Sequence, residues 1–153
     1  MSRIADRLAE LGLTLPAVAA PVAAYVPAVV QGNLVYTSGQ LPFVDGALPA
    51  TGKVGASVSA EEAQAYAATC ALNALAAIHG VIGSLDRVTQ IVKVTGFVAS
   101  DPSFTGQPGV VNGASTLLGE IFGDSGAHAR SAVGVAVLPM DAPVEVELVV
   151  AFA

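Results

Sequence analysis

The segment that most constrains the fold is residues 129–138, because it has no face suited to water. In a β-strand, successive side chains point to opposite faces of the sheet. One face of this strand would carry Ser131 and three valines, and the other would carry Arg130, three small residues and Leu138. An antiparallel sheet with helices on one side normally shows polar residues on the other. The segment therefore predicts a sheet that is covered on both faces.

The rest of the chain is too short to supply that second cover. Its 153 residues suffice for one domain with a real core. Charged residues make up 12% of the chain, about half of the roughly 25% that is usual, while 54% are hydrophobic. Exposed apolar surface promotes association. We therefore expect other copies of the chain to cover the second face, as in a symmetric homo-oligomer.

Charge and composition exclude several classes of protein. The net charge is −6, and six Lys and Arg residues form no basic run, so we expect neither nucleic acid nor an anionic membrane as a partner. Two histidines and one cysteine provide neither a disulfide framework nor a closed zinc site, and we expect no metal. No charge occurs between Glu10 and Asp45, but four prolines interrupt that stretch, which argues against a membrane span. Without a secretory signal, the expected location is cytoplasmic.

The N-terminal part of the chain reads as a helix and an arm preceding the main domain. A helix over residues 3–12 ends at Gly12, and the proline-containing residues 14–23 form an extended arm. We accordingly divide the chain into residues 1–23 and a single domain over 24–153. The domain begins with a predicted hairpin and a loop: strands 25–30 and 33–38 with a turn over 31–33, then a long loop over 41–58.

The remaining elements alternate between helices and strands. Ser59 and Glu62 form a capping pair for a helix that continues to Gly80. Four glycines weaken the second helix, and Pro108 suggests that its regular part starts there. The elements predicted after the loop are a helix over 60–79, a strand over 86–99, a helix over 104–122 and strands over 129–138 and 144–152. This order predicts an α+β domain with two helices packed on one face of a sheet.

Arg130 is the most informative candidate for chemistry. It is the only Lys or Arg after Lys93, and it lies in an apolar strand. An unpaired buried charge is costly, and the planar guanidinium suits bidentate binding of a carboxylate. A structural ion pair with Glu145 or Glu147 would explain the same pattern.

The two glutamates share one face of the last strand. A carboxyl group among valines can have a raised pKa and serve as a general acid or base, although a solvated edge strand would also carry two surface glutamates. Further polar contacts could come from Tyr25, Ser38 and Asn112. Gly39 would let the backbone approach a ligand closely.

Three other signals are ambiguous or misleading. Residues 123–126 spell Gly-Asp-Ser-Gly, as around a serine protease nucleophile, but a chain this short predicts a helix-ending turn instead. Cys70 lies mid-helix among alanines and reads as an inert core thiol. His128, two residues before Arg130, could border the site, although its position favours a surface turn.

Three segments together resemble a known family. They are Asn-Leu-Val-Tyr-Thr-Ser-Gly-Gln-Leu-Pro at 33–42, a strand ending in Gly-Phe-Val at 87–98, and Ala-Arg-Ser through Val-Glu-Val-Glu at 129–147. In this order they resemble the RidA/YjgF (reactive intermediate deaminase) family, formerly called endoribonuclease L-PSP-like. The resemblance covers residues 24–153, and the N-terminal extension suggests a longer-chain, less characterised branch.

The resemblance implies a chorismate-mutase-like α+β fold with a mixed sheet, assembled as a trimeric barrel with clefts between subunits. It implies hydrolysis of reactive enamines and imines, in particular 2-imino acids, to 2-oxo acids and ammonia. It implies no cofactor, whether metal or organic. The alternatives are a non-catalytic trimer that binds a small carboxylate metabolite and, less in keeping with the acidic composition, a ribonuclease or translation inhibitor.

The resemblance also assigns roles to residues. Arg130 would hold the substrate carboxylate, and Glu145 would position the attacking water. The pocket would be lined by Tyr25, Ser38, Gly39 and Asn112. Ala132 stands where the family usually has a cysteine, so a thiol contact is lost there and only a backbone contact could survive.

Overall fold

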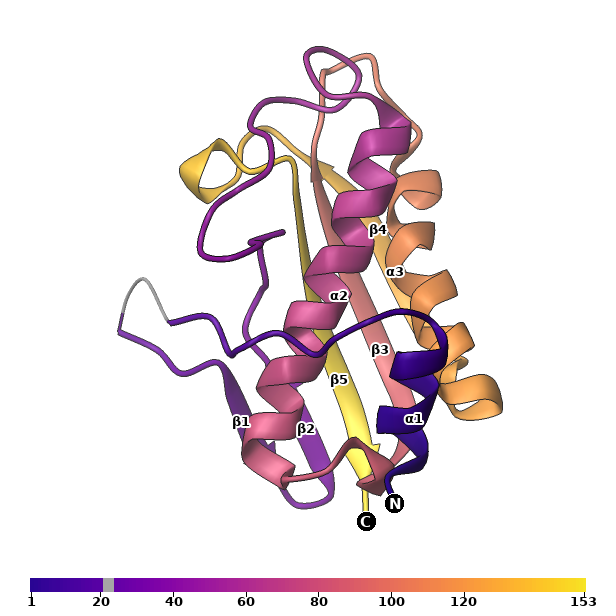
Figure 1. Ribbon diagram of the computed structural model, residues 1–153. Coiled ribbons are helices and arrows are strands. Elements are labelled where there is room, and N and C mark those ends of the chain that lie inside the picture. The colour runs from indigo at the N-terminus through magenta and orange to yellow at the C-terminus, as the bar shows by residue number, and fades with distance from the viewer. Residues whose placement is uncertain (21–23) are drawn as a thin grey trace.

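The computed structural model describes residues 1–20 and 24–153, which form a mixed five-stranded sheet with helices on one face (Figure 1). The strand order is β1-β2-β5-β3-β4; β3 and β4 are parallel, and the other neighbours are antiparallel. The strands are β1 (Ala28–Gln31), β2 (Leu34–Thr37), β3 (Val88–Ala99), β4 (Ala129–Val135) and β5 (Val144–Phe152). The predicted hairpin is confirmed as the β1–β2 pair.

Helices α2 (Ala60–Ile82) and α3 (Gln107–Phe122) cover the same face of the sheet, and α1 (Arg3–Glu10) packs beside them (Figure 1). The core between helices and sheet is fully buried and aliphatic, with Leu75, Ile78, Leu118 and Leu148 among its largest side chains. By length and composition alone α2 could cross a membrane. However, eleven of its residues are buried against the domain, which makes it a core helix here. The α+β class is confirmed.

The ends of α2 show where local signals succeeded and where they fell short. Ser59 Oγ accepts a hydrogen bond from Glu62 N at 3.1 Å, as the capping pair predicted. The helix continues past Gly80 and ends at Gly83, whose φ of 81° lies in the left-handed region. Glycine is favoured there because it lacks the Cβ that makes this conformation costly. Gly80 is tolerated inside the helix.

Helix α3 begins at Gln107 with Pro108 in its first turn, close to the predicted start. One of its glycines has a packing role. A Cβ built on Gly113 would lie 1.9 Å from the carbonyl oxygen of Gln64 on α2. The backbones of α2 and α3 therefore approach so closely at this point that a side chain cannot fit between them.

Helix α1 belongs to the main core, since Ile4 and Leu8 are buried in it. Its N-terminus is held by Asp86, whose carboxylate accepts hydrogen bonds from Ile4 N at 2.7 Å and Arg3 N at 3.0 Å. These bonds, chiefly that from Ile4 N, lower the pKa of Asp86. The predicted boundary after residue 23 lies outside the described residues. The described part of the arm continues from α1, and Leu13 and Leu15 pack against the core.

Three predicted strand boundaries were wrong by two or more residues. The first strand begins at Ala28, so Tyr25 lies in the segment before it. The central strand begins at Val88, because residues 85–87 form a 3-10 turn in which Ser84 Oγ accepts from Asp86 N. The fourth strand ends at Val135, short of the predicted 138. The Gly-Asp-Ser-Gly segment is confirmed as a turn after α3.

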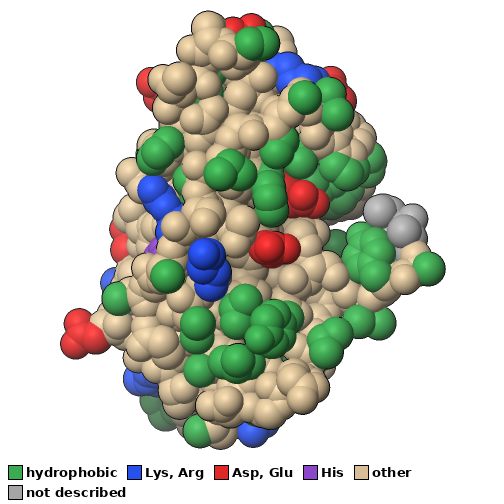
Figure 2. Space-filling view, turned by 180° about the vertical axis from the view of Figure 1, so that it is seen from behind, with side chains coloured by type: hydrophobic (Ala, Val, Ile, Leu, Met, Phe, Trp, Pro, Cys, Tyr) green, Lys and Arg blue, Asp and Glu red, His purple; other side chains and the backbone are tan. Residues whose placement is uncertain are grey.

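The second face of the sheet carries no helix of the described chain (Figure 2). Hydrophobic side chains gather there, and Val29, Tyr36 and Val133 remain 52%, 46% and 44% exposed. Acidic side chains lie in the middle of this face in Figure 2. We call it the open face. Because one chain leaves so much apolar surface uncovered, the face fits the predicted contact between copies, and the trimeric barrel stays a prediction.

Candidate functional site

Arg130 lies on β4 with its guanidinium turned toward α3. Its Nη1 donates to Asn112 Oδ1 at 2.7 Å and to Ser115 Oγ at 3.2 Å. Both hydrogens of Nη1 are thereby used, and the plane of the guanidinium is held by one helix. Within residues 1–20 and 24–153, Nε and Nη2 have no hydrogen-bond partner, and Arg130 forms no ion pair. Nε and Nη2 form the edge that binds a carboxylate with two parallel hydrogen bonds.

The alternative of an ion pair between Arg130 and the glutamates of β5 was wrong. Arg130 pairs with Val94 on β3, and Val94 pairs with Leu148 on β5, so these three share the face under the helices. Glu145 and Glu147 alternate with Leu148 and project from the open face. Arg130 and Glu145 of one chain therefore face opposite sides of the same sheet.

Glu145 lies in a small cavity together with Tyr25 and Gly39. Three predicted site residues, distant in sequence, meet there. The other residues lining the cavity are Ala19, Ala20, Pro27, Gln40, Leu41, Phe43 and Pro139. Its volume is about 60 Å³, well below the roughly 300–1,000 Å³ of a typical ligand pocket. The cavity provides one wall of a binding site rather than a complete one.

Gly39 is required by the position of Glu145. A Cβ built on Gly39 would lie 2.7 Å from both Cδ and Oε1 of Glu145. The neighbouring backbone is fixed, because Gln40 N donates to Val146 O at 2.8 Å and Val146 N donates to Gln40 O at 3.0 Å. The sequence suggested that Gly39 allows close approach of a ligand. In the structure it allows close approach of the glutamate itself.

The environment of Glu145 raises the pKa of its carboxyl group. Burial is the main cause, and the negative charge of Glu147 on the same face adds to it. A carboxyl group whose pKa is shifted toward neutrality is a better proton acceptor for a water molecule than an ordinary surface glutamate. The raised pKa is in keeping with the role toward a water molecule that was predicted for Glu145.

Ser38 supports this cavity but does not line it. Its hydroxyl donates to Val26 O at 2.6 Å, and its backbone N–H donates to Pro27 O at 2.8 Å. These two bonds hold the segment that carries Tyr25. Tyr25 itself is 45% exposed. The contact of Ser38 in this chain is thus with the segment beside Tyr25.

Ala132 lies on β4 two residues beyond Arg130 and packs against the core. Because Ser100 N donates to Val135 O, the backbone groups of Val135 point toward β3. Backbone groups alternate in direction along a strand, so those of Ala132 point to the free edge of the sheet. An edge strand offers such groups to a partner, which keeps a backbone contact at Ala132 available.

Sequence reasoning missed Ser115 and undervalued His128. His128 Nε2 lies 2.9 Å from Ser115 Oγ, so the half-buried histidine borders the Arg130 site and does not lie in a free surface turn. The signal was present in the sequence. Ser115 follows Asn112 by three residues on one helix face, and His128 precedes Arg130 by two residues, just before β4 begins at Ala129.

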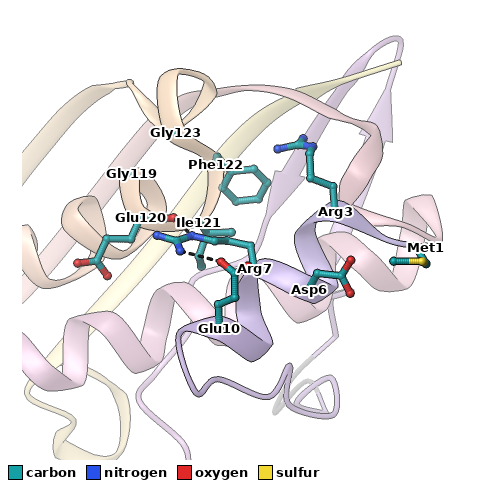
Figure 3. A pocket seen from close by; sticks show the side chains of 10 residues that line it. All are labelled: Met1, Arg3, Asp6, Arg7, Glu10, Gly119, Glu120, Ile121, Phe122 and Gly123. Atoms are coloured by element: carbon teal, nitrogen blue, oxygen red, sulfur yellow. Dashed lines mark hydrogen bonds and ion pairs between the residues drawn. The ribbon is translucent and has the colours of Figure 1, made fainter.

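A larger hollow, of about 720 Å³, lies between α1 and the C-terminal end of α3 (Figure 3). None of the predicted site residues lines it. Arg7 is already engaged there, donating from Nε to Glu120 O at 2.8 Å and pairing with Glu10 at 3.0 Å. This hollow marks where α1 docks on α3.

Comparison with known proteins identifies the family. The family model for "YjgF/chorismate mutase-like, putative endoribonuclease" matches residues 5–153. Protein TCP17 of Trypanosoma cruzi is 48% identical over 149 residues, covering 97% of this chain and 93% of that protein.

Two crystal structures show the same likeness. Atu1372 of Agrobacterium tumefaciens, a protein of unknown function, is 45% identical with a TM-score of 0.92, covering 99% of this chain and 93% of that one. E. coli TdcF with bound serine is 26% identical with a TM-score of 0.62, covering 92% of this chain and 96% of TdcF. The chain belongs to the YjgF/chorismate mutase-like family.

Proposed function

We propose that the protein is a homotrimer that hydrolyses small 2-imino acids to 2-oxo acids and ammonia at sites between protomers. The observation that carries the proposal is the arrangement of Arg130. Two hydrogen bonds from Nη1 to α3 hold its guanidinium, and its Nε–Nη2 edge has no partner in the described part of the chain. Such an edge matches a carboxylate. The serine bound to E. coli TdcF carries a carboxylate of this kind.

The second component is Glu145 in its small cavity. Because Arg130 and Glu145 of one chain lie on opposite faces, one substrate can reach both only where two chains meet. β4 is at the edge of the sheet, and the open face is apolar and uncovered. In the proposed trimer, the β4 edge of one protomer lies against the open face of the next. Arg130 of the first then faces the cavity of Glu145 in the second.

The proposed reaction needs only orientation and proton transfer. Arg130 holds the carboxylate, so the imine carbon is presented to a water molecule beside Glu145. Glu145 accepts a proton as the water oxygen bonds to carbon, and the C=N electron pair moves to nitrogen. Glu145 returns that proton to the nitrogen, which gives a neutral carbinolamine. The carbinolamine collapses when its hydroxyl proton passes by way of Glu145 to the amine nitrogen, so that the C–N bond breaks, a C=O bond forms and ammonia leaves. A positioned base of this kind contributes about 10²–10⁴-fold.

A coupled assay tests this function. A dehydratase acting on serine or threonine generates the imino acid, and semicarbazide traps what has not been hydrolysed. The wild-type protein should accelerate loss of the imine, and Arg130→Ala should abolish both turnover and binding. Arg130→Lys is the matched control for charge, because it keeps the cation but loses the planar fork; it should also bind poorly. Glu145→Gln should bind and lose turnover by about 10²–10⁴-fold.

A second candidate is a trimer that binds small carboxylates without turnover. The separation of Arg130 and Glu145 within one chain favours it, because Arg130 alone suffices for binding. In that case the wild-type protein would bind pyruvate without accelerating imine loss, and Glu145→Gln would change nothing. The family description also mentions an endoribonuclease. Twelve acidic residues against six basic ones make a ribonuclease the weakest candidate.

A further inference from the structure

A chain of three hydrogen bonds connects Arg130 to the turn after α3. Arg130 Nη1 lies 3.2 Å from Ser115 Oγ, Ser115 Oγ lies 2.9 Å from His128 Nε2, and His128 Nδ1 lies 2.6 Å from the carbonyl oxygen of Gly126. The four groups come from β4, α3, the segment between Gly123–Gly126 and β4, and that turn itself.

The chemistry of these groups determines which atom donates and which accepts in each of the three hydrogen bonds. A carbonyl oxygen only accepts, so His128 Nδ1 must carry the proton that binds Gly126 O. In the neutral imidazole Nε2 is then an acceptor, and Ser115 donates its only proton to it. The lone pairs of Ser115 Oγ remain for Arg130. Each donor in the series therefore faces an acceptor.

Without His128, Ser115 would have another partner available. A serine inside a helix commonly turns its hydroxyl back to the carbonyl four residues earlier, which here belongs to Val111. His128 competes with that arrangement by accepting the hydroxyl proton from the side of β4. The position of Ser115 Oγ, and with it one of the two bonds to Nη1 of Arg130, thus depends on the histidine.

Gly126, the last group in this series of hydrogen bonds, is held firmly in place. Gly126 is buried, and a Cβ built on it would lie 2.5 Å from the carbonyl oxygen of Leu118. The turn therefore packs directly on the backbone of α3. Its carbonyl can hold the imidazole in one orientation, because hydrogen bonds to the surrounding structure fix the orientation of functional side chains.

We infer that His128 and Ser115 are positioning residues that orient the guanidinium of Arg130 for carboxylate binding. The inference rests on the proposed function of Arg130. His128 fixes the hydroxyl of Ser115, and Ser115 together with Asn112 occupies Nη1. The Nε–Nη2 edge is then presented in a fixed plane, so less orientational freedom is lost when a carboxylate binds.

Matched variants of His128 distinguish the hydrogen bond at its Nε2 from the one at its Nδ1. His128→Gln places an amide oxygen near the position of Nε2 and can accept from Ser115. His128→Asn is shorter; its amide can donate to Gly126 O but does not reach Ser115. In an NMR titration with pyruvate, His128→Asn and Ser115→Ala should weaken binding about ten-fold. His128→Gln should stay within about two-fold of the wild type, since the bond to the charged group is kept.

A double-mutant cycle shows whether the two residues act through Arg130. In an Arg130→Lys background, Ser115→Ala and His128→Asn should weaken pyruvate binding no further. An effect of unchanged size in that background would overturn the inference, as would wild-type affinity in the His128→Asn variant. Thermal unfolding of each variant identifies a loss of pyruvate binding that comes from misfolding. If His128→Asn misfolds, His128→Gln is the variant that tests the inference, and an affinity outside the expected range of about two-fold would contradict it.

Two NMR signatures test the positioning without any ligand. Long-range proton–nitrogen spectra should show His128 with its proton on Nδ1, and a proton on Nε2 alone would contradict the network. Rotation of the guanidinium about its Nε–Cζ bond should be slow in the wild type and faster in Ser115→Ala and His128→Asn. If Arg130→Ala leaves pyruvate binding intact, the proposed function fails, while these two measurements still decide whether His128 and Ser115 hold Arg130.

Discussion

Arg130 and Glu145 project from opposite faces of one sheet, with β3 lying between their strands. Each is suited to its proposed role, the first by its available Nε–Nη2 edge and the second by burial that raises its pKa. Neither can serve the same substrate molecule as the other within a single chain. The proposed activity therefore depends on assembly, and that dependence can be tested directly.

Mixing two inactive variants should restore activity. If each site takes Arg130 from one protomer and Glu145 from the next, co-refolding Arg130→Ala with Glu145→Gln gives mixed trimers with one intact site each. Random mixing of equal amounts then yields about one quarter of the wild-type turnover. Each variant refolded alone is the control. Activity that stays at the control level in mixed trimers would place both groups in one chain and contradict the intersubunit site.

Adding a methyl group at Gly39 should displace Glu145. The new Cβ would lie 2.7 Å from the carboxyl carbon of Glu145, closer than real Cβ contacts allow. We expect Gly39→Ala to lower the rate of imine hydrolysis on the order of 10²-fold, because a displacement of about 1 Å at a reacting group can cost that much. The measurement is the semicarbazide-coupled rate.

The control for that substitution is Gly109→Ala, since a Cβ on Gly109 meets no atom within 4 Å. This variant should keep the wild-type rate, and its helical position should make it slightly more stable. An equal loss of activity in both variants would show that the effect at Gly39 is not specific to Glu145.

The raised pKa of Glu145 predicts a pH-dependent effect on stability. A carboxyl group whose folded pKa lies above its unfolded value keeps its proton longer in the native state, so stability falls as pH rises through this interval. Glu145→Gln removes the penalty. The variant should be more stable than the wild type at pH 7, and the difference should disappear below the unfolded pKa of glutamate. Urea unfolding across this range measures it, and Glu120→Gln, on the exposed surface of α3, is the control.

The lowered pKa of Asp86 predicts a dependence of stability on pH with the opposite sign. Its pKa is lowered by the hydrogen bonds it accepts from the N-terminus of α1. The resulting stability is present above the unfolded pKa of aspartate and is lost as pH falls through the lower, folded pKa. Asp86→Asn should therefore speed hydrogen exchange at the amides of α1 at pH 7. Exchange in the variant that stays as slow as in the wild type would contradict this role.

The same comparison at lower pH provides the check on mechanism. As Asp86 becomes protonated, the wild type and Asp86→Asn should converge in their exchange rates over α1. Asp124→Asn is the matched control, because its exposed carboxylate accepts no hydrogen bond from the described residues. It should leave α1 unchanged at every pH.

The sequence by itself determined the order of helices and strands, the hairpin, the capping of α2 by Ser59, and the family, because these depend on local pattern and on short segments. It also placed Glu145 and Glu147 on one strand face, since alternation along a strand is a local property. It erred at strand ends such as Tyr25, because strand boundaries depend on which neighbour is available for pairing.

Only the tertiary structure decided what Arg130 contacts. Whether that guanidinium would meet Glu145, or Asn112 and Ser115, depends on the register of β3 with its two neighbours and on the position of α3 over the sheet. The same holds for Gly39, whose necessity comes from a glutamate more than a hundred positions away in the chain. Contacts between distant segments arise from the packing of whole elements, and no local pattern of residues contains that information.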